Sequence, residues 1–174
     1  MIKGTNSAKW RKSFANELGR LTQGIGDRIK SGTETLFFIR HDQDPEGQKV
    51  TYGRLVVSIC PQKEETHRVR LTVGGNLIDY PGDFSSPTAD LTTAKCLFNS
   101  VVSTPVAKFM TTDVKDFYLN TPMERYEYMR PPISLIHDEI IEQYNLLPLV
   151  QDGWVYMEIQ KVIYGLPQAG LLAN

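Results

Sequence analysis

The sequence has few of the residues that build metal centres and disulfide frameworks. Its 174 residues include two cysteines and three histidines, and neither set has the spacing of a zinc site or a disulfide scaffold. We therefore interpret Cys60 and Cys96 as buried free thiols of a reducing compartment. The histidines are expected to be surface or hydrogen-bonded residues rather than ligands.

Long apolar runs and a strong charge of either sign are also missing. No run approaches the roughly 20 residues that a membrane-spanning helix needs, and the N-terminus has no apolar stretch of the signal-peptide kind. The formal net charge is −1, whereas free-standing nucleic-acid-binding domains are usually basic. With 41% hydrophobic and 22% charged residues, the composition is that of an ordinary globular chain.

Hydrophobic periodicity predicts helices and strands in mixed order. Helices are expected over 7–23, from Pro87 or Thr88 to about Val102, and over about 135–145; strands are expected over 35–39, 52–60, 67–73, 109–114 and 154–159. A polar loop joins the second and third of these strands and predicts a β-hairpin. Because strands and helices alternate without a regular βαβ repeat, the sequence favours an α+β fold.

Two glycines, Gly24 and Gly26, follow the first predicted helix. A phosphate-binding glycine loop needs a preceding strand and a third glycine at fixed spacing, and this sequence offers neither. We therefore interpret the pair as the end of the helix rather than as a ligand site.

Two carboxylates and an aromatic residue stand together after the strand predicted over 109–114. Asp113 lies near its end, Asp116 follows three residues later and Tyr118 five residues later. Carboxylate oxygens are the ligands that Mg²⁺ prefers, so metal-assisted phosphoryl transfer could use such a group. The same residues also allow a purely structural interpretation, in which Asp113 ends a strand and Asp116 caps the next turn.

Three segments resemble reverse transcriptases. Residues 112–119 (TDVKDFYL) resemble motif A, residues 164–170 (YGLPQAG) resemble motif B, and residues 120–132 (NTPMERYEYMRPP) are similar to the signature that follows motif A in copia-type enzymes. Pro167 departs from the copia pattern, which has a lysine there. The resemblance covers residues 50–174, expected to be a partial reverse transcriptase domain, and residues 1–49 are expected to form a lead-in helix and strand.

The resemblance implies the fingers and an incomplete palm of a right-hand polymerase fold, with a mixed or antiparallel sheet and packed helices. Asp113 would be the catalytic residue and metal ligand, and the backbone carbonyl of Val114 would reach the second metal. The cofactor would be Mg²⁺ or Mn²⁺. Six residues would bind the nucleotide: Lys63 at the hairpin tip, Arg68 and Arg70 on the returning strand, Asp116, Tyr118 as the gate against a 2′-hydroxyl, and Gln168.

The implied partners are an RNA or DNA template-primer, a dNTP and the rest of a Pol polyprotein, inside the cell in a cytoplasmic particle or the nucleus. In this family a hairpin with paired aspartates follows motif B, and none appears before Asn174, so we expect the chain alone not to polymerise. Two other functions remain open. One is a non-catalytic remnant that binds nucleic acid or protein. The other is an unrelated metal-dependent phosphotransferase that would use Asp83 and Asp90.

Overall fold

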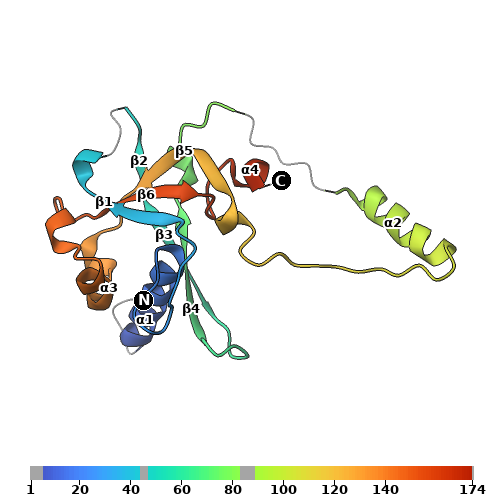
Figure 1. Cartoon of the computed structure of the whole chain (residues 1–174), viewed down its shortest axis with the longest axis horizontal. Helices are drawn as coiled ribbons and strands as arrows, with labels where there is room; N and C mark the ends of the chain where they lie inside the picture. The colour runs from blue at the N-terminus through green and yellow to red at the C-terminus, as the bar shows by residue number, and fades with distance from the viewer. Residues whose placement is uncertain (1–5, 44–46, 83–88, 174) are drawn as a thin grey trace.

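The computed structural model describes residues 6–43, 47–82 and 89–173 and has an α+β architecture (Figure 1). In its larger sheet β6 is antiparallel to both β1 and β5, whereas β2 runs parallel to β5, in the order β1-β6-β5-β2. These strands are β1 (Leu36–Ile39), β2 (Val50–Thr51), β5 (Pro122–Met129) and β6 (Tyr156–Lys161). The expected α+β class and mixed sheet are confirmed, and the right-hand polymerase fold stays a prediction.

A separate hairpin of β3 (Gly53–Ile59) and β4 (His67–Val73) confirms the hairpin expected from the sequence. Alternation along β4 buries Val69, which is 2% exposed, against the core. Arg68 and Arg70 therefore occupy the opposite face of the same strand. This face becomes important for the site described below.

Helix α1 (Ser7–Leu21) packs on β4 and covers its outer edge. The backbone N–H of Val69 donates to Ser13 Oγ at 2.9 Å, and that of Leu71 donates to Glu17 Oε1 at 3.2 Å. Polar side chains of the helix thus satisfy edge donors that would otherwise be open to another strand. The contact fixes α1 beside the arginine-bearing strand.

One hydrophobic core includes residues from both sides of the boundary expected at residue 49. Strand β1 lies in the same sheet as β6, and α3 (Asp138–Gln143) packs near α1. Fully buried members come from α1, β1, α3 and β6, namely Phe14, Leu18, Leu36, Ile140 and Ile159. The lead-in segment and the later residues therefore pack together around shared side chains.

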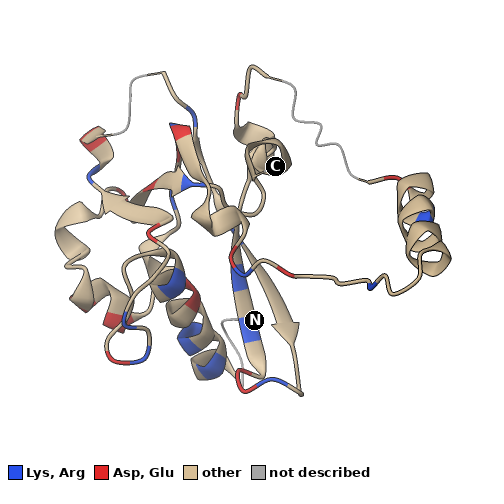
Figure 2. Cartoon of the chain, turned by 45° about the vertical axis from the view of Figure 1, so that its right-hand side comes forward, with Lys and Arg blue, Asp and Glu red and all other residues tan. Residues whose placement is uncertain are grey.

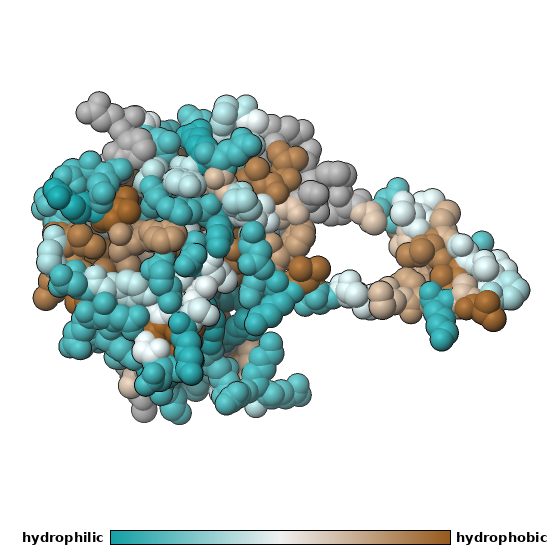
Figure 3. Space-filling view, viewed as in Figure 1, coloured by the Kyte–Doolittle hydropathy of each residue, from teal (hydrophilic) through white to brown (hydrophobic). Residues whose placement is uncertain are grey.

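Helix α2 (Leu91–Ser103) stands apart from this core (Figure 1). Every residue in it is at least partly exposed, and its apolar side chains are visible on its surface (Figure 3). The side chain of Asp90 caps it by accepting from the N–H of Thr93 at 2.6 Å. Asp90 thus has a structural role, while Asp83 and the helix start expected at Pro87 or Thr88 lie outside the described residues.

The strand predicted over 109–114 is wrong. Residues 107–114 are exposed and pair with none of the described strands, so Asp113 does not sit at a strand end. The β-branched and aromatic residues of this segment have the right propensity, but propensity forms a strand only where a partner strand supplies hydrogen bonds. Here the segment is part of the arm that leads from α2 back to the body.

The converse error concerns β5, where the sequence predicts no strand and residues 120–132 are identified only by their similarity to the signature that follows motif A. Pro122 begins the strand and Pro131 follows its end, positions where a missing N–H is tolerated. A short helix, α4 (Ala169–Ala173), follows β6. The expectation that both cysteines are buried is wrong, because Cys60 is only partly buried and Cys96 is exposed. No helix in the described ranges is long and apolar enough to cross a membrane.

Candidate functional site

A pocket of about 600 Å³ opens between α1, the loop that follows it, and β4. Residues from the turn before β5 and from the turn after β6 close its remaining sides. Its charged lining residues are Arg20, Arg28, Lys30, Arg68, Arg70 and Lys115, with two carboxylates, Glu17 and Asp116. Figure 2 shows basic residues along α1 and β4. The chain is nearly neutral overall, yet this pocket, which we call the basic pocket, gathers positive charge.

Two of the six cations are already paired with carboxylates. Arg20 donates to Glu65 at 2.5 Å, and Arg28 holds Glu139 through two bonds of 2.7 and 2.8 Å. Partial burial raises the pKa of Glu65. The interactions that lower it, led by the hydrogen bonds from Asn16 and Arg20, together outweigh the effect of burial, so the pKa lies below its ordinary value. These pairs fix the walls of the basic pocket.

The other four cations make no ion pair within 4.0 Å among the residues that the structure describes. They are Lys30, Arg68, Arg70 and Lys115. Lys30, Arg70 and Lys115 are exposed to solvent. Their charge is therefore available to an anionic ligand that enters the basic pocket.

Glu17 is the buried carboxylate of the pocket wall. Burial raises its pKa, and the Leu71 N–H, Arg20, Arg68 and Arg70 act in the opposite direction. Because its Oε1 accepts the Leu71 N–H, the carboxylate is held against β4. Its charge only partly offsets that of the arginines on the same strand.

The segments that resemble motifs A and B meet beside the basic pocket. Tyr118 and Tyr164 contact each other edge to face with ring centroids 5.5 Å apart, and the Arg70 guanidinium lies 5.8 Å from the Tyr164 centroid. The N–H of Val73 donates to the Tyr164 carbonyl at 2.8 Å. Gly165 has φ 98°, and a Cβ there would lie 2.2 Å from the Val73 carbonyl oxygen. The turn therefore needs glycine to approach β4 this closely.

The two residues expected to hold metal lie outside this pocket. Asp113 and Val114 are exposed on the arm that leads back from α2, and Val114 is 61% exposed. Asp116 does line the pocket, with φ 55° in the left-handed region that aspartate tolerates. The described residues contain no group of three or more His, Cys, Asp or Glu side chains placed to share a metal ion.

Two expected nucleotide-binding residues are also placed elsewhere. Lys63 lies in the exposed hairpin turn, near Glu65 and Arg68 but not among the residues that line the basic pocket. Gln168 is 1% exposed and contacts the side chain of Glu127, a residue that is itself 2% exposed. One oxygen of each side chain has no hydrogen-bond partner in the described part of the chain. Arg68, Arg70 and Asp116 are thus the expected nucleotide-binding residues that line the basic pocket, with Tyr118 beside it.

Four lining cations were not singled out by the sequence: Arg20, Arg28, Lys30 and Lys115. Residues 28–33 follow the glycine pair at Gly24 and Gly26, which had been set aside because the spacing fits no known phosphate loop. Lys115 lies within the motif A segment, but the resemblance assigns it no role. Neither signal is specific without the fold that brings the segments together.

Searches against protein-family models, curated proteins and solved structures each return no match for this chain. The function is therefore inferred from the residues of the pocket and from the motif resemblance.

Proposed function

We propose that the chain supplies the nucleotide-binding side of an RNA-directed DNA polymerase of the copia type, and that the basic pocket receives the triphosphate of an incoming dNTP. One observation supports this most strongly. Arg68 and Arg70 of the hairpin, Asp116 of the motif A segment and Tyr164 of the motif B segment all line the same pocket. These segments are far apart in sequence, and the polymerase interpretation requires them to converge.

The chemistry of the pocket suits a triphosphate. Guanidinium groups bind phosphate oxygens through paired N–H donors and would offset charge that develops during nucleotidyl transfer. Arg68 and Arg70 are two residues apart on one strand, so both reach the same side of the ligand. Tyr118, held against Tyr164, would lie near the sugar, which is the place that the resemblance gives to the 2′-hydroxyl gate.

The divalent metal implied by the resemblance does not fit the described residues as they stand. Asp116 faces the pocket beside Lys115, and Asp113 lies on an exposed arm outside it. A hard cation needs several oxygen ligands together, and this pocket supplies two carboxylates, Glu17 and Asp116, among six cations, with Glu17 held by the Leu71 N–H. Mg²⁺ or Mn²⁺ therefore stays a prediction, and we derive no step through it.

Calorimetric titration with dTTP, dTMP and deoxythymidine tests the proposal. We expect affinity to rise with the number of phosphates, and Arg70→Ala to weaken dTTP binding by about three- to tenfold. Arg54→Ala is the matched control, because Arg54 is an exposed arginine on the neighbouring strand that does not line the pocket. Equal affinity for dTTP and deoxythymidine would refute a triphosphate site.

The excess of cations over carboxylates also favours a second candidate, a binding protein for single-stranded nucleic acid without chemistry. Contacts to phosphate would again dominate the affinity, but the pocket would bind a free nucleotide no more tightly than a nucleic-acid strand of the same charge. A short oligothymidylate that binds more tightly than dTTP, and that loses affinity in Arg70→Ala, would support this candidate over the first.

A further inference from the structure

The loop that follows α1 forms a wall of the basic pocket, although no motif marked it. Residues 28–33 line the pocket together with β4. Lys30 is exposed and belongs to no ion pair within the described ranges. An ammonium group in this position adds positive charge to a site that already contains two arginines, which destabilises the empty pocket slightly and favours a bound anion.

This loop is held in place from several sides. Arg28 binds Glu139 of α3 with both terminal nitrogens, and the N–H of Gly26 donates to Gln143 Oε1 at 2.8 Å. The Tyr144 hydroxyl donates to the Gly24 carbonyl at 2.6 Å. The wall is therefore organised before any ligand arrives, which reduces the entropy lost on binding.

The backbone of this loop packs closely against itself and against the end of α1. A Cβ built on Gly24 would lie 2.4 Å from the Ile29 carbonyl oxygen, and one on Gly32 would lie 2.0 Å from the Thr22 carbonyl oxygen. Glycine at these two positions lets the loop fold tightly onto the end of α1. Gly24, interpreted from the sequence as part of the helix end, thus also shapes the base of this pocket wall.

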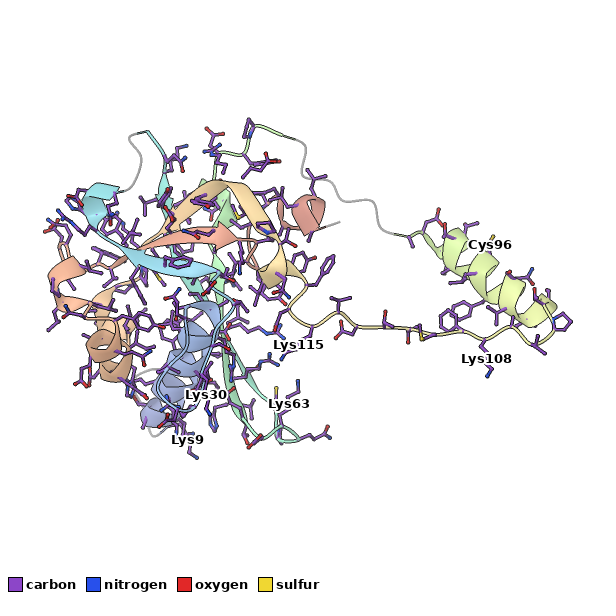
Figure 4. The ribbon with its side chains drawn as sticks, viewed as in Figure 1. Lys9, Lys30, Lys63, Cys96, Lys108 and Lys115 are labelled. Atoms are coloured by element: carbon purple, nitrogen blue, oxygen red, sulfur yellow. The ribbon has the colours of Figure 1, made fainter. Side chains whose placement is uncertain are left out.

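Lys115 lines the pocket from another segment of the chain. It lies where the arm from α2 rejoins the body, as Figure 4 shows, and it precedes Asp116 in the sequence. Its side chain is exposed and, like that of Lys30, outside any ion pair in the part of the chain that the structure describes. The negative charge of Asp116 offsets part of this positive charge. Four cations outside any ion pair and two carboxylates nevertheless leave the pocket with an excess of positive charge.

We propose that Lys30 and Lys115 are two further phosphate-binding residues, which contact the triphosphate of the nucleotide from the sides that Arg68 and Arg70 leave open. The inference rests on the proposed function, since it takes a nucleoside triphosphate as the ligand. Each lysine would donate to phosphate oxygens as a flexible point charge, whereas the arginines supply the fixed geometry. The contacts would be sensitive to salt because both lysines are at the solvent edge.

The experiment is a calorimetric titration of inorganic tripolyphosphate and of dTTP into the full chain, at low and high salt. Lys30→Ala and Lys115→Ala are each expected to weaken both ligands by about threefold, and the double variant by about tenfold. The control is Lys108→Ala, an exposed lysine on the same arm that is far from the pocket (Figure 4). All variants alter exposed side chains, and circular dichroism melts check that each stays folded.

The outcomes separate this inference from the proposed function. Unchanged affinity in the double variant, together with a loss in Arg70→Ala, would overturn the lysine contacts and leave the nucleotide site standing. If tripolyphosphate binds as tightly as dTTP and both depend on Lys30, the lysine contacts hold but the nucleotide function fails. A wild-type chain that binds neither ligand would overturn both.

Discussion

Tyr118 and Tyr164 lie edge to face with ring centroids 5.5 Å apart, although they belong to two distant segments of the chain. The contact places the turn after β6 beside the turn before β5, and Arg70 of β4 lies over the same Tyr164 ring. Three separate segments thus meet at one edge of the basic pocket. The geometry makes the tyrosine pair the link between the hairpin and the two motif segments.

The turn that carries Tyr164 depends on Gly165. We expect Gly165→Ala to lower the free energy of unfolding by about 3 kcal/mol, because a Cβ meets the Val73 carbonyl oxygen and the φ of 98° is strained for alanine. Gly153→Ala is the control: its φ is 81°, but a Cβ there meets nothing within 4 Å. It should lose only about 1 kcal/mol. Urea denaturation measures both, and equal losses would show that the contact with β4 is unimportant.

Tyr144 joins the loop after α1 to α3. Its hydroxyl donates to the Gly24 carbonyl and accepts from the Gln23 N–H at 3.2 Å. Tyr144→Phe removes both bonds, leaving the Gln23 N–H without this acceptor and the Gly24 carbonyl with only the Gln143 amide at 3.2 Å, and should lower the free energy of unfolding by about 1–3 kcal/mol. Tyr126→Phe, at a 39% exposed position, should change it by less than about 0.5 kcal/mol. If the free energy of unfolding of Tyr144→Phe equals that of the wild-type chain, water replaces the hydroxyl as the hydrogen-bond partner.

Glu127 should make stability depend on pH. Burial raises its pKa above the ordinary value of 4.5, so between 4.5 and the raised pKa the folded state binds more protons than the unfolded state. Stability should therefore fall as pH rises through this window, and Glu17 contributes with the same sign. Glu127→Gln should flatten the slope, while Glu124→Gln, at an exposed site on the same strand, should not. Urea denaturation from pH 5 to pH 8 measures the pH dependence of the free energy of unfolding in each variant.

Helix α2 should contribute little to the stability of the body. Leu97 is 53% exposed, and Leu97→Ala is expected to change the free energy of unfolding by less than about 0.5 kcal/mol. Ile140 of α3 is fully buried, and Ile140→Ala should lose about 2–5 kcal/mol. A large loss from Leu97→Ala would instead show that α2 packs against the body in solution.

Local patterns predicted the elements whose partners are adjacent in sequence. The alternation of β3 and β4 gave the hairpin, and the apolar stripe of α1 gave the helix that covers it. The segment 109–114 has similar strand-forming residues, but among the described residues no strand pairs with it. Without the hydrogen bonds of a partner strand, its propensity does not produce a strand. The reverse holds for β5, where β6 supplies a partner that outweighs the flanking prolines.

The candidate site could be predicted only in part for the same reason. Arg68, Arg70 and Asp116 were identified because they lie in segments that resemble known motifs. Lys30 belongs to no motif, and its place in the pocket follows from the way Arg28 and Tyr144 tie its loop to α3. Such long-range contacts leave no spacing rule in the sequence.

A nitrogen-15 NMR titration of the labelled chain with dTTP tests the triphosphate site most directly. The side-chain Nε–H signals of Arg68 and Arg70, and the backbone N–H signals of Lys30, Lys115 and Asp116, should shift together with one dissociation constant. Deoxythymidine should leave them unchanged. If dTTP moves none of these signals, or moves only signals remote from the basic pocket, the proposed nucleotide-binding function is wrong.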